Sequence, residues 1–323
     1  MNRTIKIFYL ILLFLSTFHF KAIAEPTLVR SKAVENVSGY QTMALTFNND
    51  GTKMYTSSMS AASGAKSDKV YEYDLTTAYN ISTATLRTSI DVGSYPEPGP
   101  SNTGNHGAMQ VVFNNDGTKM FIADHNRTII EWTLTTPYDI DTASTTFNLG
   151  QSFDTGGQEK RPTSVAFNND GTRMYLNDGS KNVTDITQVN LSTPFDPSSG
   201  TFAFNLNTED IPDLRVNGFT FEIAFDDDGT RLYISEGLNN HTAVPTFMFV
   251  YKLSTPFELS SATYVGASQI VGNGNNVSAV GFTFGNNGMK AYIGTEDANP
   301  DGDDIIYEYD LTCPYGIVIC ESE

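Results

Sequence analysis

One acidic stretch of the sequence has the residue spacing of a cation-binding loop. In DANPDGDDIIYE, which covers 297–308, oxygen-bearing side chains alternate ahead of a glycine at Asp297, Asn299 and Asp301. Oxygen atoms at alternate positions wrap a hard cation, and glycine permits the sharp turn that this needs. The spacing therefore predicts a candidate Ca²⁺ site made by these three side chains and the main-chain carbonyl of Asp303.

This stretch also departs from the calcium-loop pattern in several ways. Pro300 interrupts it, Asp304 stands where an apolar residue is usual, and strands are expected on both sides where helices normally flank such a loop. Glu308 completes the motif, but Glu72 and Glu131 stand at the same place in related stretches that lack the acidic loop. The alternative interpretation is a solvated acidic hairpin loop.

Ten other residues are candidates for contacting a ligand through a charged or imidazole side chain. They are His106, Asp124, His125, Arg127, Arg161, Asp178, Arg215, Glu222, Glu236 and His241. All except Glu222 fall in polar segments that vary along the chain, and such segments on a rigid scaffold commonly carry recognition.

Catalysis would need a more specific arrangement than these segments reveal. A glycosidase requires two carboxylates at a defined separation. The variable segments supply enough acids, namely Asp124, Asp178, Glu209, Asp210, Glu236 and Glu296. The sequence alone brings no two of them together. It also contains no G-x-S-x-G, H-E-x-x-H or P-loop pattern.

The elements that position these residues come from a repeated phrase. Copies of FNNDGTKMY begin at Phe47, Phe113, Phe167, Phe225 and Phe284, so the intervals are 66, 54, 58 and 59 residues. Each copy follows a short apolar run. The Asn-Asn-Asp-Gly letters favour a tight turn between antiparallel strands, with the glycine at positive φ. The fifth copy, FGNNGMKAY, is the most altered.

Two further strands follow each phrase. The third alternates and is rich in Val, Ile and Tyr, as in VYEYDL and IYEYDL, and after it comes a bend such as STPF and then a fourth strand. Four strands per unit and no helical period predict an all-β chain, a single five-bladed β-propeller of antiparallel blades. The last unit lacks a fourth strand, and the N-terminal segment TLVRSKAVENVS is spare, so it should complete the last blade and close the ring.

Glu222 falls on the expected innermost strand of the fourth blade. The other blades carry Ala44, Gln110, Ser164 and Gly281 at that place. A carboxylate among small residues beside a central channel either lines a ligand pocket or is simply solvated there.

The F-x-x-D-G-T-K-M-Y phrase, followed by Y-E-Y-D-L and S-T-P-F, resembles the secreted bacterial propeller repeats grouped with the YVTN and NHL-like classes. The resemblance covers the chain from about Thr27 to Tyr315 and implies the propeller fold. It implies little about activity, because such propellers serve as binding platforms, enzyme scaffolds and surface proteins alike.

The ends of the chain indicate export. Residues 1–24 contain Arg3 and Lys6, then an apolar run, then Ala22-Ile23-Ala24, which is the pattern of a cleaved signal peptide. The propeller domain would be 25–323, secreted or periplasmic, with no transmembrane segment after cleavage. In that oxidising setting Cys313 and Cys320 should form a structural disulfide.

The charge narrows the class of partner. The net charge is −18, and removal of residues 1–24 takes away three basic residues and no acidic one, which lowers it to −21. Nucleic acids and anionic lipids are therefore poor partners. The sequence favours an exported, non-catalytic propeller that binds an envelope or extracellular polysaccharide, a peptide or a protein through its variable segments. The alternatives are a calcium-assisted glycosidase or lactonase and a structural component of a surface layer.

Overall fold

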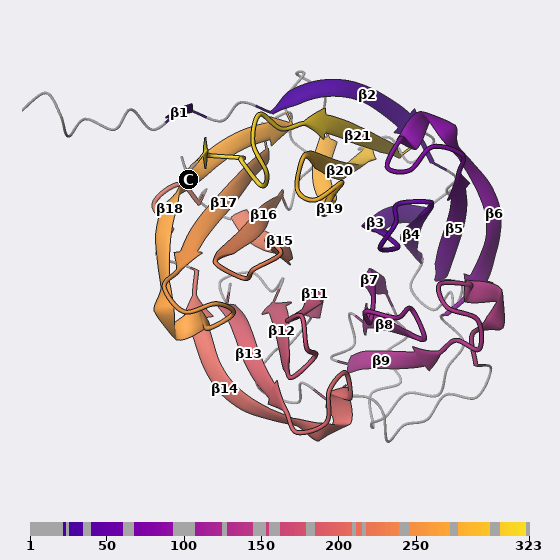
Figure 1. Cartoon of the computed structure of the whole chain (residues 1–323), viewed down its shortest axis with the longest axis horizontal. Helices are drawn as coiled ribbons and strands as arrows, with labels where there is room; N and C mark the ends of the chain where they lie inside the picture. The colour runs from indigo at the N-terminus through magenta and orange to yellow at the C-terminus, as the bar shows by residue number, and fades with distance from the viewer. Residues whose placement is uncertain are drawn as a thin grey trace, which may run out of the picture.

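The computed structural model shows a ring of five β-sheets around a central axis (Figure 1). The structure describes residues 22–23, 26–34, 40–60, 68–92, 107–124, 128–144, 153–154, 162–178, 185–208, 211–214, 218–238, 246–271, 277–297 and 304–320. Within these residues each of the five sheets has four antiparallel strands, and the innermost strand of each lies nearest the axis. The predicted five-bladed propeller is therefore confirmed.

Each blade runs outward in chain order, with a short 3₁₀ helix before the outer strand of blades 1 to 4. Blade 1 holds β3 (Tyr40–Phe47), β4 (Lys53–Ser60), β5 (Lys69–Leu75), η1 (Ile81–Thr83) and β6 (Ala84–Asp91). Blade 2 holds β7 (Ala108–Phe113), β8 (Lys119–Asp124), β9 (Thr128–Thr133), η2 (Ile140–Thr142) and β10 (Phe153–Asp154). Blade 3 holds β11 (Pro162–Phe167), β12 (Arg173–Asp178), β13 (Asp185–Leu191), η4 (Pro197–Ser199) and β14 (Gly200–Asn207).

The last two blades follow the same order with one exception. Blade 4 holds β15 (Gly218–Phe225), β16 (Arg231–Leu238), β17 (Thr246–Leu253), η5 (Leu259–Ser261) and β18 (Ala262–Val271). Blade 5 holds β19 (Val277–Gly285), β20 (Lys290–Asp297) and β21 (Ile305–Asp310), and its outer strand is the N-terminal β2 (Thr27–Ala33).

The two ends of the chain close the ring as the sequence predicts. In Figure 1 the indigo β2 lies along the yellow β21, and the two pair from Thr27 with Asp310 to Ala33 with Ile305. The last residues are tied down by a disulfide between Cys313 and Cys320. A two-residue strand, β1 (Ala22–Ile23), pairs with β22 (Ile319–Cys320). Most of the predicted signal peptide lies outside the described residues.

The turn phrase Asn-Asn-Asp-Gly and the bend of the STPF type, which recur in each repeat, pack against each other. The turn glycine Gly171 has φ +70°, and a Cβ there would lie 2.2 Å from the ring of Phe195, the aromatic residue of STPF. Phe195 itself has φ +54°, and its N–H donates to the Gly171 carbonyl at 2.9 Å. The same contact recurs in the other blades as Gly51 with Tyr79, Gly117 with Tyr138, Gly229 with Phe257 and Gly288 with Tyr315. The glycine and the aromatic residue therefore depend on each other, because the aromatic ring occupies the space that a side chain of the glycine position would take.

The core lies between neighbouring blades. An aromatic residue of each second strand packs on the phenylalanine at or next to the end of the next inner strand, with ring centroids 4.5–4.7 Å apart. The pairs are Tyr55–Phe113, Phe121–Phe167, Tyr175–Phe225, Tyr233–Phe284 and Tyr292–Phe47. The last pair joins blade 5 to blade 1, so the aromatic packing is continuous around the ring.

All four of these tyrosines also hydrogen-bond to the next blade. The hydroxyl of Tyr175, for example, donates to the main-chain oxygen of Phe257 at 2.5 Å. Phe121 of blade 2 has no hydroxyl, and there Lys119 Nζ donates to the equivalent oxygen, that of Phe195, at 2.9 Å. The bonded contact between blades is thus kept where the tyrosine is absent.

The ring has two different faces. We call the face that carries the Asn-Asn-Asp-Gly turns the turn face, and the opposite one, where second strands end and third strands begin, the loop face. The described residues include no helix of the length and hydropathy needed to cross a membrane.

Candidate functional site

Four of the ten predicted ligand-contacting residues can be placed. They are Asp124, Asp178, Glu222 and Glu236, and each is at most 1% exposed. The other six lie outside the described residues, namely His106, His125, Arg127, Arg161, Arg215 and His241. The structure therefore does not test whether the predicted set converges on a ligand.

Three of the placed carboxylates belong to strands, whereas the sequence suggested loops. Asp124, Asp178 and Glu236 occupy the same position in β8, β12 and β16, and all are buried at the loop-face end of the strand. Asp124 Oδ1 accepts a hydrogen bond from Gly107 N at 3.1 Å, just before the inner strand of the same blade. This carboxylate thus holds a main-chain N–H in place.

Blades 1 and 5 carry the acid at a neighbouring position. Ser58 and Thr295 replace it in the second strand, and buried Asp68 and Asp304 stand immediately before the third strand. Asp304 Oδ2 accepts from Thr42 N at 2.7 Å, which ties blade 5 to the inner strand of blade 1. Among the described residues, each blade therefore has a buried carboxylate near its loop-face end, and those of Asp124 and Asp304 accept from main-chain N–H groups at or just before an inner strand.

Glu222 is buried and not solvated beside an open channel, which excludes one of the two interpretations given by the sequence. Its Oε1 accepts from Gln110 Nε2 at 2.6 Å, and its Oε2 accepts from the main-chain N of Phe282. Gln110 Oε1 in turn accepts from Ser164 Oγ at 2.8 Å. Side chains from blades 2, 3 and 4 thus meet at the axis and bind a main-chain group of blade 5.

Small residues make room for this axial network. Gly281 occupies the equivalent place in blade 5, and a Cβ there would lie 3.2 Å from the main-chain N of Leu45 in blade 1. The inner strands of all five blades have a register irregularity at this level. Burial raises the pKa of Glu222 well above its usual range, against the two hydrogen bonds that favour the ionised form.

A second set of buried side chains, two acids and one amide, joins neighbouring blades near the rim. Glu72 is fully buried, and its Oε2 accepts from Ile140 N, the first residue of η2 in the next blade, at 3.0 Å. Glu308 does the same for Ile81 N at 3.2 Å, and Gln188 Oε1 for Leu259 N at 2.9 Å. In blade 3 the corresponding residue is Pro197, which has no N–H to donate to Glu131.

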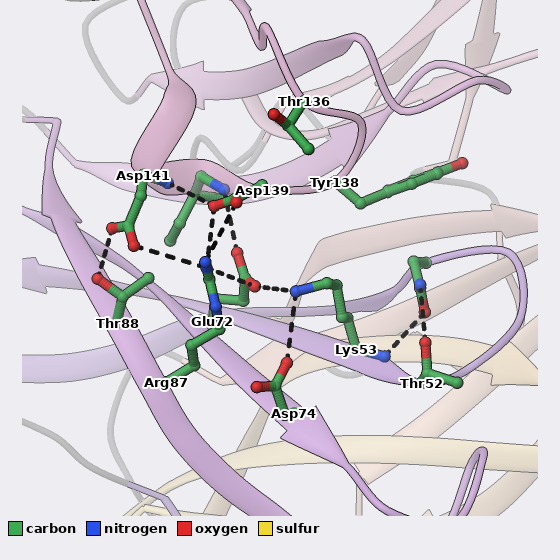
Figure 2. Close-up of polar contacts among 12 residues, drawn as sticks. Thr52, Lys53, Glu72, Asp74, Arg87, Thr88, Thr136, Tyr138, Asp139 and Asp141 are labelled. Carbon is green, nitrogen blue, oxygen red and sulfur yellow. Dashed lines mark hydrogen bonds and ion pairs between the residues drawn. The ribbon is translucent and has the colours of Figure 1, made fainter.

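Figure 2 shows the surroundings of Glu72. Its Oε1 pairs with Lys53 Nζ and, at 2.9 Å, with Arg87 Nη1. Arg87 also reaches Asp139 of blade 2 in a bidentate pair at 2.9 and 3.1 Å. The sequence showed this acid as a recurring letter of the third strand, but only the structure shows that it bonds across the blade boundary.

The predicted calcium loop remains a prediction. Asp297 is the last residue of β20, and Asn299, Asp301 and Asp303 lie outside the described residues. Within the part of the chain that the structure describes, no three His, Cys, Asp or Glu side chains are close enough together to hold a metal ion.

Comparison with known proteins adds only general likenesses of fold. No family model matches the sequence, and no curated protein matches it. The β-propeller domain of Cps50 (Swd1) from Myceliophteria thermophila is 10% identical, with a TM-score of 0.45 over 90% of this chain and 88% of that one. A functionally unknown protein from Desulfotomaculum acetoxidans is 14% identical, with a TM-score of 0.43 over 87% and 76%. Neither likeness extends to an activity or a partner.

Proposed function

We propose that this protein is an exported, non-catalytic propeller that binds a polysaccharide, a peptide or a surface protein through its loop face. The observation that supports this most is the burial of the candidate carboxylates. Asp124, Asp178, Glu222 and Glu236 are at most 1% exposed. A general acid or nucleophile has to reach its substrate, so these four are unsuited to that role in this conformation.

The repeat pattern adds a second reason. On the turn face, the residues that recur in each blade are engaged in turns, as Gly171 and Phe195 are, and in inter-blade bonds, as Phe195 O is with Lys119. The segments that differ between blades begin and end at strand ends on the loop face, such as those after Asp124 and Asp178. A rigid ring that presents varied polar segments on one face is a common form of recognition surface. Export rests on residues 1–24 and on the resemblance to secreted repeat proteins.

The test uses the purified chain on arrays of bacterial polysaccharides and peptides. One variant replaces Arg127, Arg161 and Arg215 with alanine, and a control, Asn115→Ala, changes the turn face. The proposal expects binding to at least one array component that falls at least about tenfold in the triple variant and is unchanged in the control. Release of reducing ends or lactone hydrolysis by the wild type would contradict the non-catalytic assignment. Equal binding by all three proteins would contradict the loop face as the site.

A further inference from the structure

The fifth repeat builds a different turn from the other four. In blades 1 to 4 an Asn or Asp at the start of the turn accepts a hydrogen bond from the N–H five residues later, as Asn48 Oδ1 does from Lys53 N at 2.9 Å. Gly285 takes that place in blade 5. Here Asn286 and Asn287 adopt positive φ of 52° and 53°, and Met289 N bonds to Asn286 O at 3.1 Å. The residues that differ in this copy therefore give the turn of blade 5 a different conformation.

The change also interrupts a chain of bonds between turns. Asn49 Nδ2 donates to Asn115 O at 2.7 Å, Asn115 Nδ2 to Asn169 O at 2.6 Å, and Asn169 Nδ2 to Asp227 O at 2.7 Å. Asp227 has no side-chain N–H with which to continue toward blade 5. Among the described residues, neither Asn286 nor Asn287 uses its side-chain amide to bond another part of the chain.

A pocket of about 300 Å³ lies on the turn face at this interruption. Residues of blades 4, 5 and 1 line it, including Asp227, Asn286, Asn287 and the aromatic rings of Tyr79 and Tyr315. The volume is at the lower end of the roughly 300–1,000 Å³ typical of ligand pockets. The pocket is thus suited to a small ligand.

The lining determines the ligand chemistry. Asp227 is its one charged residue, and burial together with this nearby carboxylate raises the pKa of the Tyr315 hydroxyl. Anions are disfavoured because no basic residue lines the pocket and the protein carries a net charge of −18. An ammonium ion only donates hydrogen bonds, so it would leave the amide N–H groups of Asn286 and Asn287 unused. Hydroxyl groups donate to the carboxylate and accept from the amides, and aromatic rings offer apolar surface to the C–H groups of a sugar ring.

We infer that this turn-face pocket, lined by Asp227, Asn286, Asn287 and aromatic rings, binds a neutral polyhydroxylated ring the size of one sugar residue. Asp227 accepts from two adjacent hydroxyls, and the two asparagine amides fix the orientation. The site lies on the opposite side of the ring from the loop face, so it does not depend on the function proposed above.

The test measures binding of glucose, galactose, mannose and N-acetylglucosamine to the purified chain by calorimetry and by NMR. For a ligand of this size an affinity on the order of 1 mM is expected, so each sugar is used up to about 10 mM. Asp227→Ala should weaken binding of the preferred sugar at least about tenfold, because it removes a charged acceptor but leaves the main-chain oxygen that Asn169 uses. The matched control is Asn115→Ala, at the same turn position in blade 2, which should bind as the wild type does.

Thermal unfolding of each variant checks that the ring remains folded. If Asp227→Ala unfolds, Asp227→Asn replaces it and should show the same loss of binding. No binding of any of the four sugars would overturn the inference, as would binding that both Asp227 variants retain. The second outcome would place the sugar elsewhere and leave the loop-face proposal intact. Binding of tetramethylammonium with no binding of sugars would show that the pocket is a cation site and would also overturn the inference.

Discussion

Gln110 and Glu222 meet at the axis of the ring, where Gln110 Nε2 donates to Glu222 Oε1 at 2.6 Å although the two residues are 112 positions apart. They come from blades 2 and 4, which are not neighbours. Both side chains are buried, so the bond is a buried polar contact between two blades. Because such contacts are costly when half satisfied, the protonation of Glu222 should affect the stability of the whole ring.

The stabilising effect of Glu222 should decrease as pH rises. Burial raises the folded-state pKa above the ordinary 4.5, so from about that pH upward the unfolded chain releases a proton that the folded protein keeps. The free energy of unfolding then decreases with rising pH until the pH exceeds the folded-state pKa of Glu222. The free-energy cost of Glu222→Gln, measured by urea unfolding, should therefore be largest near pH 4 and shrink toward pH 8. A cost that is constant or grows with pH would contradict this.

Glu72→Ala should be among the most destabilising changes on the rim, at about 3–5 kcal/mol, because it leaves Lys53 and Arg87 without their buried partner and Ile140 N without its acceptor. Glu72→Gln should cost only about 1–2 kcal/mol, because an amide oxygen can accept from the helix, as Gln188 does in blade 3. Asp74→Ala, which removes an exposed partner of Lys53, is the control and should change stability by less than about 1 kcal/mol. Equal costs for all three would refute the inter-blade role of Glu72.

Gly171→Ala should cost about 1–2 kcal/mol for its positive φ alone, and more because the added methyl group displaces the ring of Phe195. In a Phe195→Ala background only the cost of the positive φ remains, because no aromatic ring is displaced. A double-mutant cycle of equilibrium unfolding should thus show a coupling of about 1 kcal/mol or more between the two positions. Additive costs would mean that the ring and the glycine are independent.

The fold was predictable because it depends on short sequence patterns that recur along the chain. Five copies of the turn phrase gave the number of blades, and the missing fourth strand at one end with a spare strand at the other gave the closure by β2. The turn chemistry acts within a few residues, so it can be read without knowing the distant contacts.

The site residues were less predictable because their surroundings come from distant parts of the chain. Asp124 was assigned to a loop since strand ends are hard to place within two residues, and its hydrogen bond comes from Gly107, just before the neighbouring strand. The burial of Glu222 requires Gln110 and the main chain of Phe282, which no local pattern connects to it. The turn-face pocket was not predicted, because the residues that differ in the fifth repeat were interpreted only as a loss of the motif.

Deletion of residues 25–34 should abolish the single cooperative unfolding transition. It removes β2, and with it Arg30, which pairs with Glu308 at 3.5 Å, so blade 5 loses its outer strand. A synthetic peptide of the same residues should restore the transition in proportion to its concentration. Leu28→Ser is the control, since Leu28 is 41% exposed and the substitution keeps the pairing. A truncated protein that melts as the full chain does would refute closure by this strand.

The position of β2 also constrains the order of events as the protein is made. The strand that completes the last blade is among the first to be synthesised, and its partner β21 comes some 280 residues later, since Thr27 pairs with Asp310. Closure of the ring must therefore wait until β21 has been synthesised, and contacts of such long sequence separation form slowly. Until then β21 presents an open edge that the first strand of a second copy fits equally well. At high local concentration, nascent chains are thus liable to exchange their first strands and emerge as swapped dimers.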